Sequence, residues 1–305
     1  MRFSLGLPTD RVDAPAEFVS GAAVGEVAAA AEAAGFASCF VTEHPFPPEK
    51  WLRHGGHHAL DPFVALSFAA AATSTLRLQT SMVVAGYRNP FMLAKAAASL
   101  DALSGGRLIL GLAAGYLEKE FDAVGGDFAG RSAAVDAAIA ASRAAWSGSV
   151  VTWEGPGFRA AGNVMLPTPA RPDGPPIWVG GNSRAAIRRA VESAEGWVPF
   201  PTPAGVARAA RTAAIESVDD LAERIVYARE HAEAVGRTRA LDICFVSRSL
   251  NMIEAGRYDR ARVVDEAAEL ESLGVTWLHV TLPARSRTSL LAAVEEFGSS
   301  VIDAR

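Results

Sequence analysis

Short apolar runs alternate with longer amphipathic segments along the chain, and this order constrains the fold more than any other feature of the sequence. Each run has the length of a strand, and each longer segment carries apolar residues at helical spacing. The predicted strands are residues 2–7, 38–42, 76–84, 107–112, 177–179, 196–200, 241–246 and 276–280. The predicted helices are residues 22–34, 62–73, 90–103, 131–146, 184–194, 218–235, 257–273 and 288–301. Strands that alternate with helices pair in parallel through right-handed crossovers.

Eight strand–helix units of this kind close into a (β/α)8 TIM barrel, an α/β fold, and we expect residues 1–305 to form one such domain. An open doubly wound sheet is the alternative. It is disfavoured because Gly180 and Gly181, which could form a Rossmann turn, lack GxGxxG spacing and follow the fifth strand rather than the first. Residues 148–170 break the alternation with glycine, proline and aromatic residues, as expected for a hairpin-like insertion.

The composition excludes several classes of protein. Half of the residues are hydrophobic and 21% are charged, which allows a sizeable core and excludes a disordered chain. The net charge of −5 disfavours a nucleic-acid binder, which would carry a basic excess. No apolar run reaches the ~18 residues that indicate a membrane span. The two cysteines, Cys39 and Cys244, lie in apolar runs and fit no disulfide framework or metal motif, so we expect a cytoplasmic protein with no membrane partner.

His44 is the strongest single candidate for a catalytic residue. The active site of such a barrel lies at the carboxyl ends of its strands, and His44 directly follows the second predicted strand. An imidazole there can donate, accept or transfer a proton near neutral pH. A hydrogen-bonded structural histidine is the alternative. Glu43 alternates to the opposite side of the strand, so we do not expect Glu43 and His44 to form an acid–base pair.

The turn Gly180-Gly181-Asn182-Ser183 is the second candidate site. It joins the fifth strand to a helix, so its backbone N–H groups and the helix dipole face the mouth of the barrel. A phosphate commonly binds at such a late strand–helix junction in this architecture. The alternative is a plain tight turn in which Ser183 caps the helix.

Residues 53–58, Arg-His-Gly-Gly-His-His, invite a metal-site interpretation that we do not favour. The spacing fits no helical ligand pair and no carboxylate or cysteine joins the histidines, so a mobile lid over the mouth is the better hypothesis. No GxSxG or HExxH motif is present, and no nucleophile–base pair supports a hydrolase. An inventory of one imidazole and one phosphate cradle suits a barrel in which an organic cofactor performs the difficult step.

Several segments together resemble the luciferase-like monooxygenase superfamily, in the branch described as F420-dependent. They are DPFVAL at 61–66, AATSTLRL at 71–78, YRNP at 87–90, LDALSGGR at 100–107, GYLEKEF at 115–121 and PPIWVGG at 175–181. The resemblance extends from the first strand to about residue 200. It implies a TIM barrel with an insertion and a flavin or the deazaflavin F420 across its mouth.

The resemblance also implies roles for individual residues. His44 would lie near the isoalloxazine ring, and Ser81 and Met82 would form a bulge with a non-prolyl cis peptide behind it. The remaining cofactor-binding residues would be Gly115 and Tyr116 at the ring edge and Gly180, Gly181, Asn182 and Ser183 at the phosphate. The acidic tail of F420 would favour arginines near the mouth, for which the candidates are Arg53, Arg88, Arg184 and Arg248. Residues 7–9 and Tyr116 stand where glucose-6-phosphate dehydrogenase relatives carry acidic residues, which disfavours a sugar phosphate.

Three hypotheses about function follow. The leading one is an oxidoreductase in which F420 exchanges a hydride with a small hydrophobic or planar substrate and His44 is catalytic. The second is an FMN-dependent monooxygenase that a partner reductase supplies with reduced flavin. The third is a flavin- or F420-binding protein without turnover. The resemblance further implies a homodimer.

Overall fold

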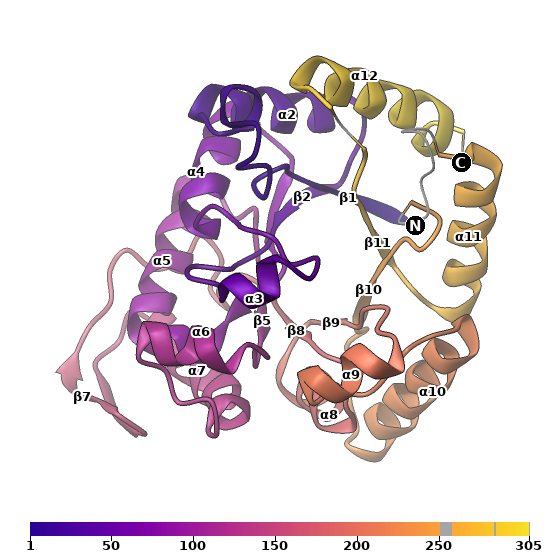
Figure 1. Cartoon of the computed structure of the whole chain (residues 1–305). Coiled ribbons are helices and arrows are strands. Elements are labelled where there is room, and N and C mark those ends of the chain that lie inside the picture. Colours follow the sequence, from indigo (N-terminus) through magenta and orange to yellow (C-terminus); the bar gives the residue numbers. More distant parts are fainter. Residues whose placement is uncertain (251–257, 284, 305) are drawn as a thin grey trace.

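Eight parallel strand positions form a closed barrel in the structure, a computed structural model that describes residues 1–250, 258–283 and 285–304 (Figure 1). In chain order these are β1 (Arg2–Gly6), β2 (Ser38–Val41), β3 (Arg77–Thr80) with β4 (Val83–Val84), β5 (Leu108–Ala113), β8 (Ile177–Gly180), β9 (Gly196–Val198), β10 (Asp242–Val246) and β11 (Trp277–Val280). Pairing between β3 and β5 closes the ring. The predicted TIM barrel is confirmed, and the open sheet is excluded.

Long helices follow the strands and cover the outside of the barrel (Figure 1). They are α2 (Gly21–Ala33), α4 (Pro62–Ala72), α5 (Pro90–Leu103), α7 (Arg131–Trp146), α8 (Arg184–Ser193), α10 (Val218–Ala234), α11 (Arg260–Leu273) and α12 (Arg287–Phe297). Asp61 and Asn89 cap α4 and α5 by accepting from backbone N–H groups, each before a proline that begins the helix. Residue 257, the predicted start of one helix, lies outside the described residues. In the described ranges, no helix combines the length and hydropathy required of a membrane span.

Four short helices lie in the loops at the mouth. Three of them were not predicted: α1 (Pro15–Phe18), α3 (Glu49–Leu52) and α6 (Glu118–Val124). The fourth, α9 (Ala204–Ala210), lies within residues 201–217, for which the sequence indicates an irregular or briefly helical segment. Segments of this length hold too few turns to show helical periodicity in a sequence. The insertion at 148–170 does contain the expected hairpin, whose antiparallel strands are β6 (Val151–Gly155) and β7 (Phe158–Asn163). It projects away from the ring in Figure 1.

The predicted single strand over residues 76–84 was wrong, because the structure divides it between β3 and β4. The peptide bond between Ser81 and Met82 is cis, as the resemblance implied. The neighbouring strand approaches closely here, since the hydroxyl of Thr80 accepts from the Gly111 N–H and donates to the Gly111 carbonyl at 2.8 and 2.9 Å. A Cβ atom at residue 111 would lie 2.1 Å from the Thr80 carbonyl oxygen, so this contact requires glycine.

The core has two compartments. The larger lies between the barrel and its helices. The smaller consists of side chains from five barrel strands: Ile109, Trp178, Val198, Cys244 and Trp277. Met82, which lines the cavity described below, packs against this compartment. Burial raises the pKa of the free Cys244 thiol well above its usual value, which keeps that thiol protonated and inert, as predicted for a core residue.

Candidate active site

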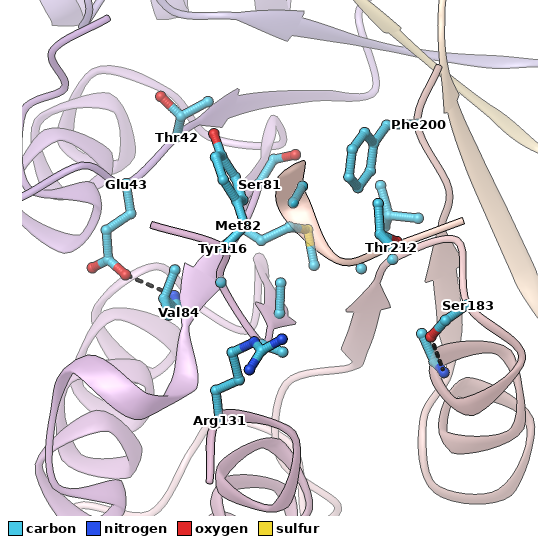
Figure 2. Close-up of a pocket in the computed structure, with 18 of the residues that line it drawn as sticks. Thr42, Glu43, Ser81, Met82, Val84, Tyr116, Arg131, Ser183, Phe200 and Thr212 are labelled. Carbon is cyan, nitrogen blue, oxygen red and sulfur yellow. Dashed lines mark hydrogen bonds between the residues drawn. The ribbon is translucent and has the colours of Figure 1, made fainter. Parts of the chain in front are cut away.

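The carboxyl ends of the strands surround a cavity of about 480 Å³ (Figure 2). Residues from β2, β4, β5, β8, β9, β10 and β11, or from the loops that follow them, contribute to its lining. Eight of the nine site residues predicted from the sequence line this cavity: His44, Ser81, Met82, Gly115, Tyr116, Gly180, Gly181 and Ser183. The structure therefore brings these side chains and turns together from separate strand–helix units.

His44 is held by a carboxylate that the sequence had not identified. Its Nδ1 lies 3.1 Å from Oε2 of Glu120, which belongs to α6. The Tyr87 hydroxyl donates to the same oxygen at 2.8 Å, and the Phe46 N–H donates to Oε1 at 3.0 Å. Because Nδ1 is engaged, Nε2 is the ring nitrogen left for a ligand in the cavity.

Glu120 is ionised in this arrangement despite complete burial. Burial raises the pKa of its carboxyl group, but the hydrogen bonds from His44, Tyr87 and Phe46 outweigh burial and lower that pKa below its usual value. A buried carboxylate that orients an imidazole is the arrangement by which many enzymes fix the tautomer of a catalytic histidine. The signal for Glu120 in the sequence was its place in the GYLEKEF segment, but 76 residues separate it from His44.

Aromatic rings surround His44 on the side toward the mouth. The centre of the Trp51 ring lies 4.4 Å from that of His44, and the His57 ring meets it edge-on at 4.8 Å. The Tyr116 ring lies 6.2 Å away. Trp51 belongs to α3, and His57 follows this helix in the chain and lines the cavity. Residues 53–58, the segment predicted as a lid over the mouth, therefore contribute His57 to the wall beside His44. That this segment moves stays a prediction.

Glu43 does not pair with His44, as the strand alternation predicted. Its carboxylate accepts from the Val84 N–H at 2.7 Å (dashed line in Figure 2) and from the Arg88 guanidinium. Burial raises the pKa of Glu43, and the positive charge of Arg88 opposes that shift. Glu43 thereby ties β2 to β4 and keeps the loop that carries Tyr87 and Arg88 in place.

Glycines keep one wall of the cavity open. Gly180 ends β8, and a Cβ atom there would lie 2.9 Å from Cγ of Met82. Gly181 has a φ of 127°, a conformation that side chains disfavour. Ser183 caps α8, and its Oγ accepts from the Ala186 N–H at 3.2 Å (Figure 2). The predicted glycine-rich turn thus stands at the start of a helix and faces the cavity.

Asn182 is placed differently from the other predicted site residues. Its side chain is fully buried and donates to the Phe200 and Ala213 carbonyl oxygens at 2.9 and 3.0 Å. It also accepts from the Phe200 N–H at 3.0 Å. The amide therefore fastens the loop after β9 to the turn. A direct contact between Asn182 and a cofactor stays a prediction.

Three arginines line the cavity on the side of β5, β8 and β9, and none of them was predicted from the sequence. They are Arg131 at the start of α7, Arg189 on α8 and Arg211 after α9. Arg189 is bound to Asp136 at 2.5 and 2.8 Å. The guanidinium carbons of Arg131 and Arg211 lie 4.0 and 5.1 Å from the centre of the Phe128 ring, and Arg211 also pairs with the exposed Glu118 at 3.8 Å. Two helix N-termini, those of α7 and α8, add their dipoles at this end.

None of the four arginines predicted near the mouth lines this cavity. Arg53 pairs with Glu49 on the surface, Arg88 with Glu43, and Arg184 lies over the Tyr227 ring. Arg248 donates to the Glu216 carbonyl oxygen. A position close to a strand end in the sequence did not identify the arginines of the cavity, because those arginines lie on helices or directly after one. In the part of the chain that the structure describes, no group of three or more His, Cys, Asp or Glu side chains could hold a metal ion.

Comparison with known proteins agrees with this architecture. The sequence profile of the luciferase-like monooxygenase family matches residues 1–262. The chain belongs to this family. Within it, an uncharacterized protein of Mycobacterium tuberculosis is 27% identical over 285 residues, which are 89% of this chain and 91% of that protein.

Two further relatives of this luciferase-like chain carry a cofactor in their names. The F420-dependent glucose-6-phosphate dehydrogenase of Intrasporangium calvum is 34% identical over 178 residues, which are 55% of this chain and 50% of that enzyme. The coenzyme F420-dependent tetrahydromethanopterin reductase of Methanopyrus kandleri superposes with a TM-score of 0.74 and 17% identity, covering 99% of each chain. The latter shows that the fold is shared. The relatives and structural neighbours agree that the family contains oxidoreductases and monooxygenases that use a flavin or F420.

Proposed function

We propose that this protein is an oxidoreductase that uses F420 for hydride transfer to or from a small organic substrate, with His44 as its catalytic residue. The observation that carries the proposal is the His44–Glu120 pair at one end of a cavity whose other end bears arginines and two helix N-termini. Bound F420 supplies two-electron hydride chemistry, and the protein supplies binding, orientation and proton handling.

The residues of the cavity fit such a cofactor. Gly180 and Gly181 leave backbone, rather than side chain, along one wall, where a Cβ atom at residue 180 would meet Met82. Ser183 and the first turn of α8 would hold a phosphate, and Gly115, Tyr116, Ser81 and Met82 would border the ring system. Burial raises the pKa of Tyr116 to about 12, so its hydroxyl remains a neutral hydrogen-bond donor.

His44 would hold or move a proton at its Nε2. Glu120 accepts from Nδ1, which leaves Nε2 to bind or protonate an oxygen or nitrogen of the substrate. Trp51 and His57 cover the pair and limit access of water to that proton. These steps use only the residues of this chain.

The arginine end favours F420 over FMN. FMN ends at one phosphate, whereas F420 continues into an acidic tail. Arg131 and Arg211, the latter in exchange for its exposed partner Glu118, would provide two cations for that tail. The alternative, an FMN-dependent monooxygenase with a partner reductase, rests on the family itself. Titration of the purified protein with F420 and with FMN, followed by fluorescence quenching, tests the choice. Tight FMN binding without F420 binding would reverse it.

The non-catalytic alternative requires its own test. If the protein only binds the cofactor, His44→Ala will change neither F420 affinity nor the turnover of F420 with any small substrate. Glu49→Ala, which removes an exposed carboxylate outside the cavity, is the matched control because it leaves the His44–Glu120 pair intact.

We further propose that the protein is a homodimer whose interface includes the outer faces of α4 and α5. Helix α4 contains no charged residue, yet its Val64 and Phe68 are 59% and 50% exposed, and Met92 of α5 is 66% exposed. A helix that is apolar on all sides is normally buried, and a second copy would cover this face symmetrically. Phe68→Glu should convert the dimer to a monomer in light scattering, while a monomeric wild-type protein would refute the proposal.

A further inference from the structure

An imidazole ring forms part of the cavity wall on the side of the barrel away from the arginines. His279 of β11 lines the cavity and is 2% exposed. Its ring stacks on that of Phe40 from β2, with centres 4.1 Å apart and planes 20° apart. Since β1 separates β2 from β11, the stack passes over β1 inside the barrel. Gly6 of β1 makes room for it, because a Cβ atom there would lie 2.9 Å from Cζ of Phe40.

Unpartnered polar atoms lie on β11, β2 and the neighbouring β3. In the described ranges, the buried side-chain atoms without a hydrogen-bond partner include Nε2 of His279, Nε2 of Gln79 and Oγ of Ser38. Strand pairing sets Ser4 beside both Ser38 and His279. The Ser4 hydroxyl also donates to Oε1 of Gln79 at 3.4 Å, although β2 separates their strands, so these side chains meet in the barrel interior.

Such a group of buried polar atoms indicates an internal water site. Buried polar atoms in native proteins are almost always paired with protein groups or with ordered water, and a buried water makes about three hydrogen bonds. One water shared by His279, Gln79 and Ser38 would satisfy all three. It would also fix the tautomer and the plane of the imidazole, leaving Nδ1 of His279 as the nitrogen available to a ligand.

We propose that His279 is a neutral hydrogen-bonding residue that selects substrates by binding an uncharged oxygen group, a carbonyl or a hydroxyl, in this part of the cavity. The inference rests on the proposed function, since it names the substrate class of the same site. Burial lowers the pKa of His279 to about 3, so the ring has no charge at neutral pH. Beside Phe40 and Val246, which also line the cavity, a carboxylate would lose its hydration without gaining a cation.

The order of the strands around the barrel separates His279 from the arginines. The arginines belong to elements that follow β5, β8 and β9, whereas His279 and Phe40 belong to β11 and β2 on the other side of the barrel. Anionic groups of a cofactor would therefore occupy one side of the cavity and a neutral substrate the other. His44 follows β2, so its Nε2 would approach the same substrate.

Acetophenone and benzoate, two probes of similar shape that differ in charge, test the proposal. Calorimetry would measure their affinity for the wild-type protein and for His279→Leu and His279→Asn, each with and without added F420. We expect the wild type to prefer acetophenone and His279→Leu to bind it about tenfold more weakly, the loss of roughly one hydrogen bond. His279→Asn should retain most of the affinity, because it keeps a donor and an acceptor. The matched control is His231→Leu on α10, outside the cavity.

The outcomes separate this inference from the proposed function. Quenching of F420 fluorescence in the same samples reports cofactor binding, and its absence counts against the proposed function while the unloaded protein still tests His279. Equal wild-type affinity for the two probes, or unchanged acetophenone binding by His279→Leu, overturns the inference. If His279→Leu does not fold, the wild-type preference and His279→Asn decide. A high-resolution crystal structure should show water between His279, Gln79 and Ser38, and a dry interior would contradict the argument.

Discussion

The two ends of the cavity differ in how their charges are held. At one end the Glu120 carboxylate is 0% exposed and accepts from His44, Tyr87 and Phe46. At the other, Arg131 and Arg211 rest against the ring of Phe128, and Arg211, 61% exposed in its side chain, pairs with the equally exposed Glu118 at 3.8 Å. A buried charge with fixed partners can set the position of a proton, whereas half-exposed cations can adapt to a ligand.

Because of this difference, we expect substitutions to separate the reaction from the binding of the cofactor. Variants at the His44 end should change turnover while the cofactor still binds. Variants at the arginine end should change cofactor affinity while turnover at saturation is kept. A single set of measurements, F420 affinity and turnover with cyclohexenone as probe substrate, therefore examines both ends.

The largest effect is expected for His44→Ala. Removal of the imidazole should lower turnover by about 10²–10⁴-fold, the usual contribution of a general acid or base. The affinity for F420, measured by fluorescence quenching, should change little. An equal loss of affinity and turnover would instead assign His44 to cofactor binding and abolish the contrast between the two ends.

Glu120→Gln should have the next largest effect. It preserves the size of the side chain but removes the charge that orients His44, and such supporting residues are typically worth about 10–100-fold in activity. The variant should also alter the pH profile of turnover, which a merely structural role would not do. Asp122→Asn, at an exposed position of the same helix, is the matched control.

The charge of Glu120 also makes stability depend on pH. Its pKa is lower in the folded protein than the usual 4.5, so the unfolded chain binds the proton more readily. The stabilisation is present above pH 4.5 and is lost as the pH falls through the lower, folded-state pKa. Urea unfolding of wild type and Glu120→Gln should therefore give free energies that converge as the pH falls below 4.5, and a constant difference would contradict this.

Arg211→Ala should weaken F420 binding by up to about fivefold, which corresponds to one exposed ion pair of at most ~1 kcal/mol. Turnover at saturating F420 should stay near the wild-type value. The loss should diminish with added salt because the side chain is exposed. Arg208→Ala, on the helix just before it, is the control for a general effect of charge.

Ser183→Ala should have the smallest effect on function. The substitution removes the cap of α8, which contributes about 0.5–2 kcal/mol to stability, and one hydroxyl beside the expected phosphate. Thermal unfolding should register the change more clearly than F420 affinity. A large loss of affinity with unchanged stability would show that the Ser183 hydroxyl contributes more to phosphate binding than to capping α8.

The sequence predicted the barrel because its signals are local. Asp61-Pro62 and Asn89-Pro90 begin helices through contacts within three residues, and the apolar alternation defines each strand without knowledge of its neighbours. The glycine turn at 180–181 was found for the same reason. The apolar alternation did not show the division of residues 76–84, whereas the resemblance placed a bulge at Ser81 and Met82, the two residues between β3 and β4.

The sequence identified only part of the candidate site, because only some of its residues have a local signal. His44 was found because it follows a strand directly. Glu120 and the arginines were missed because they come from helices whose rotation and position depend on the closed barrel. Arg189, for example, reaches the cavity from the second turn of α8, a distance along the helix that no strand-end rule includes.

The two ends of the cavity also occupy consecutive stretches of the chain. His44, Trp51, Tyr87 and Glu120 all precede residue 121, whereas Arg131, Ser183 and Arg211 all follow residue 130. Residues 125–130 link the two stretches. Because Ser81, Met82, Gly115 and Tyr116, which are proposed to border the ring system, also lie in the first stretch, and because Glu118 of the first stretch pairs with Arg211 of the second, exchange of one stretch between family members would alter the cofactor site on both sides of this link.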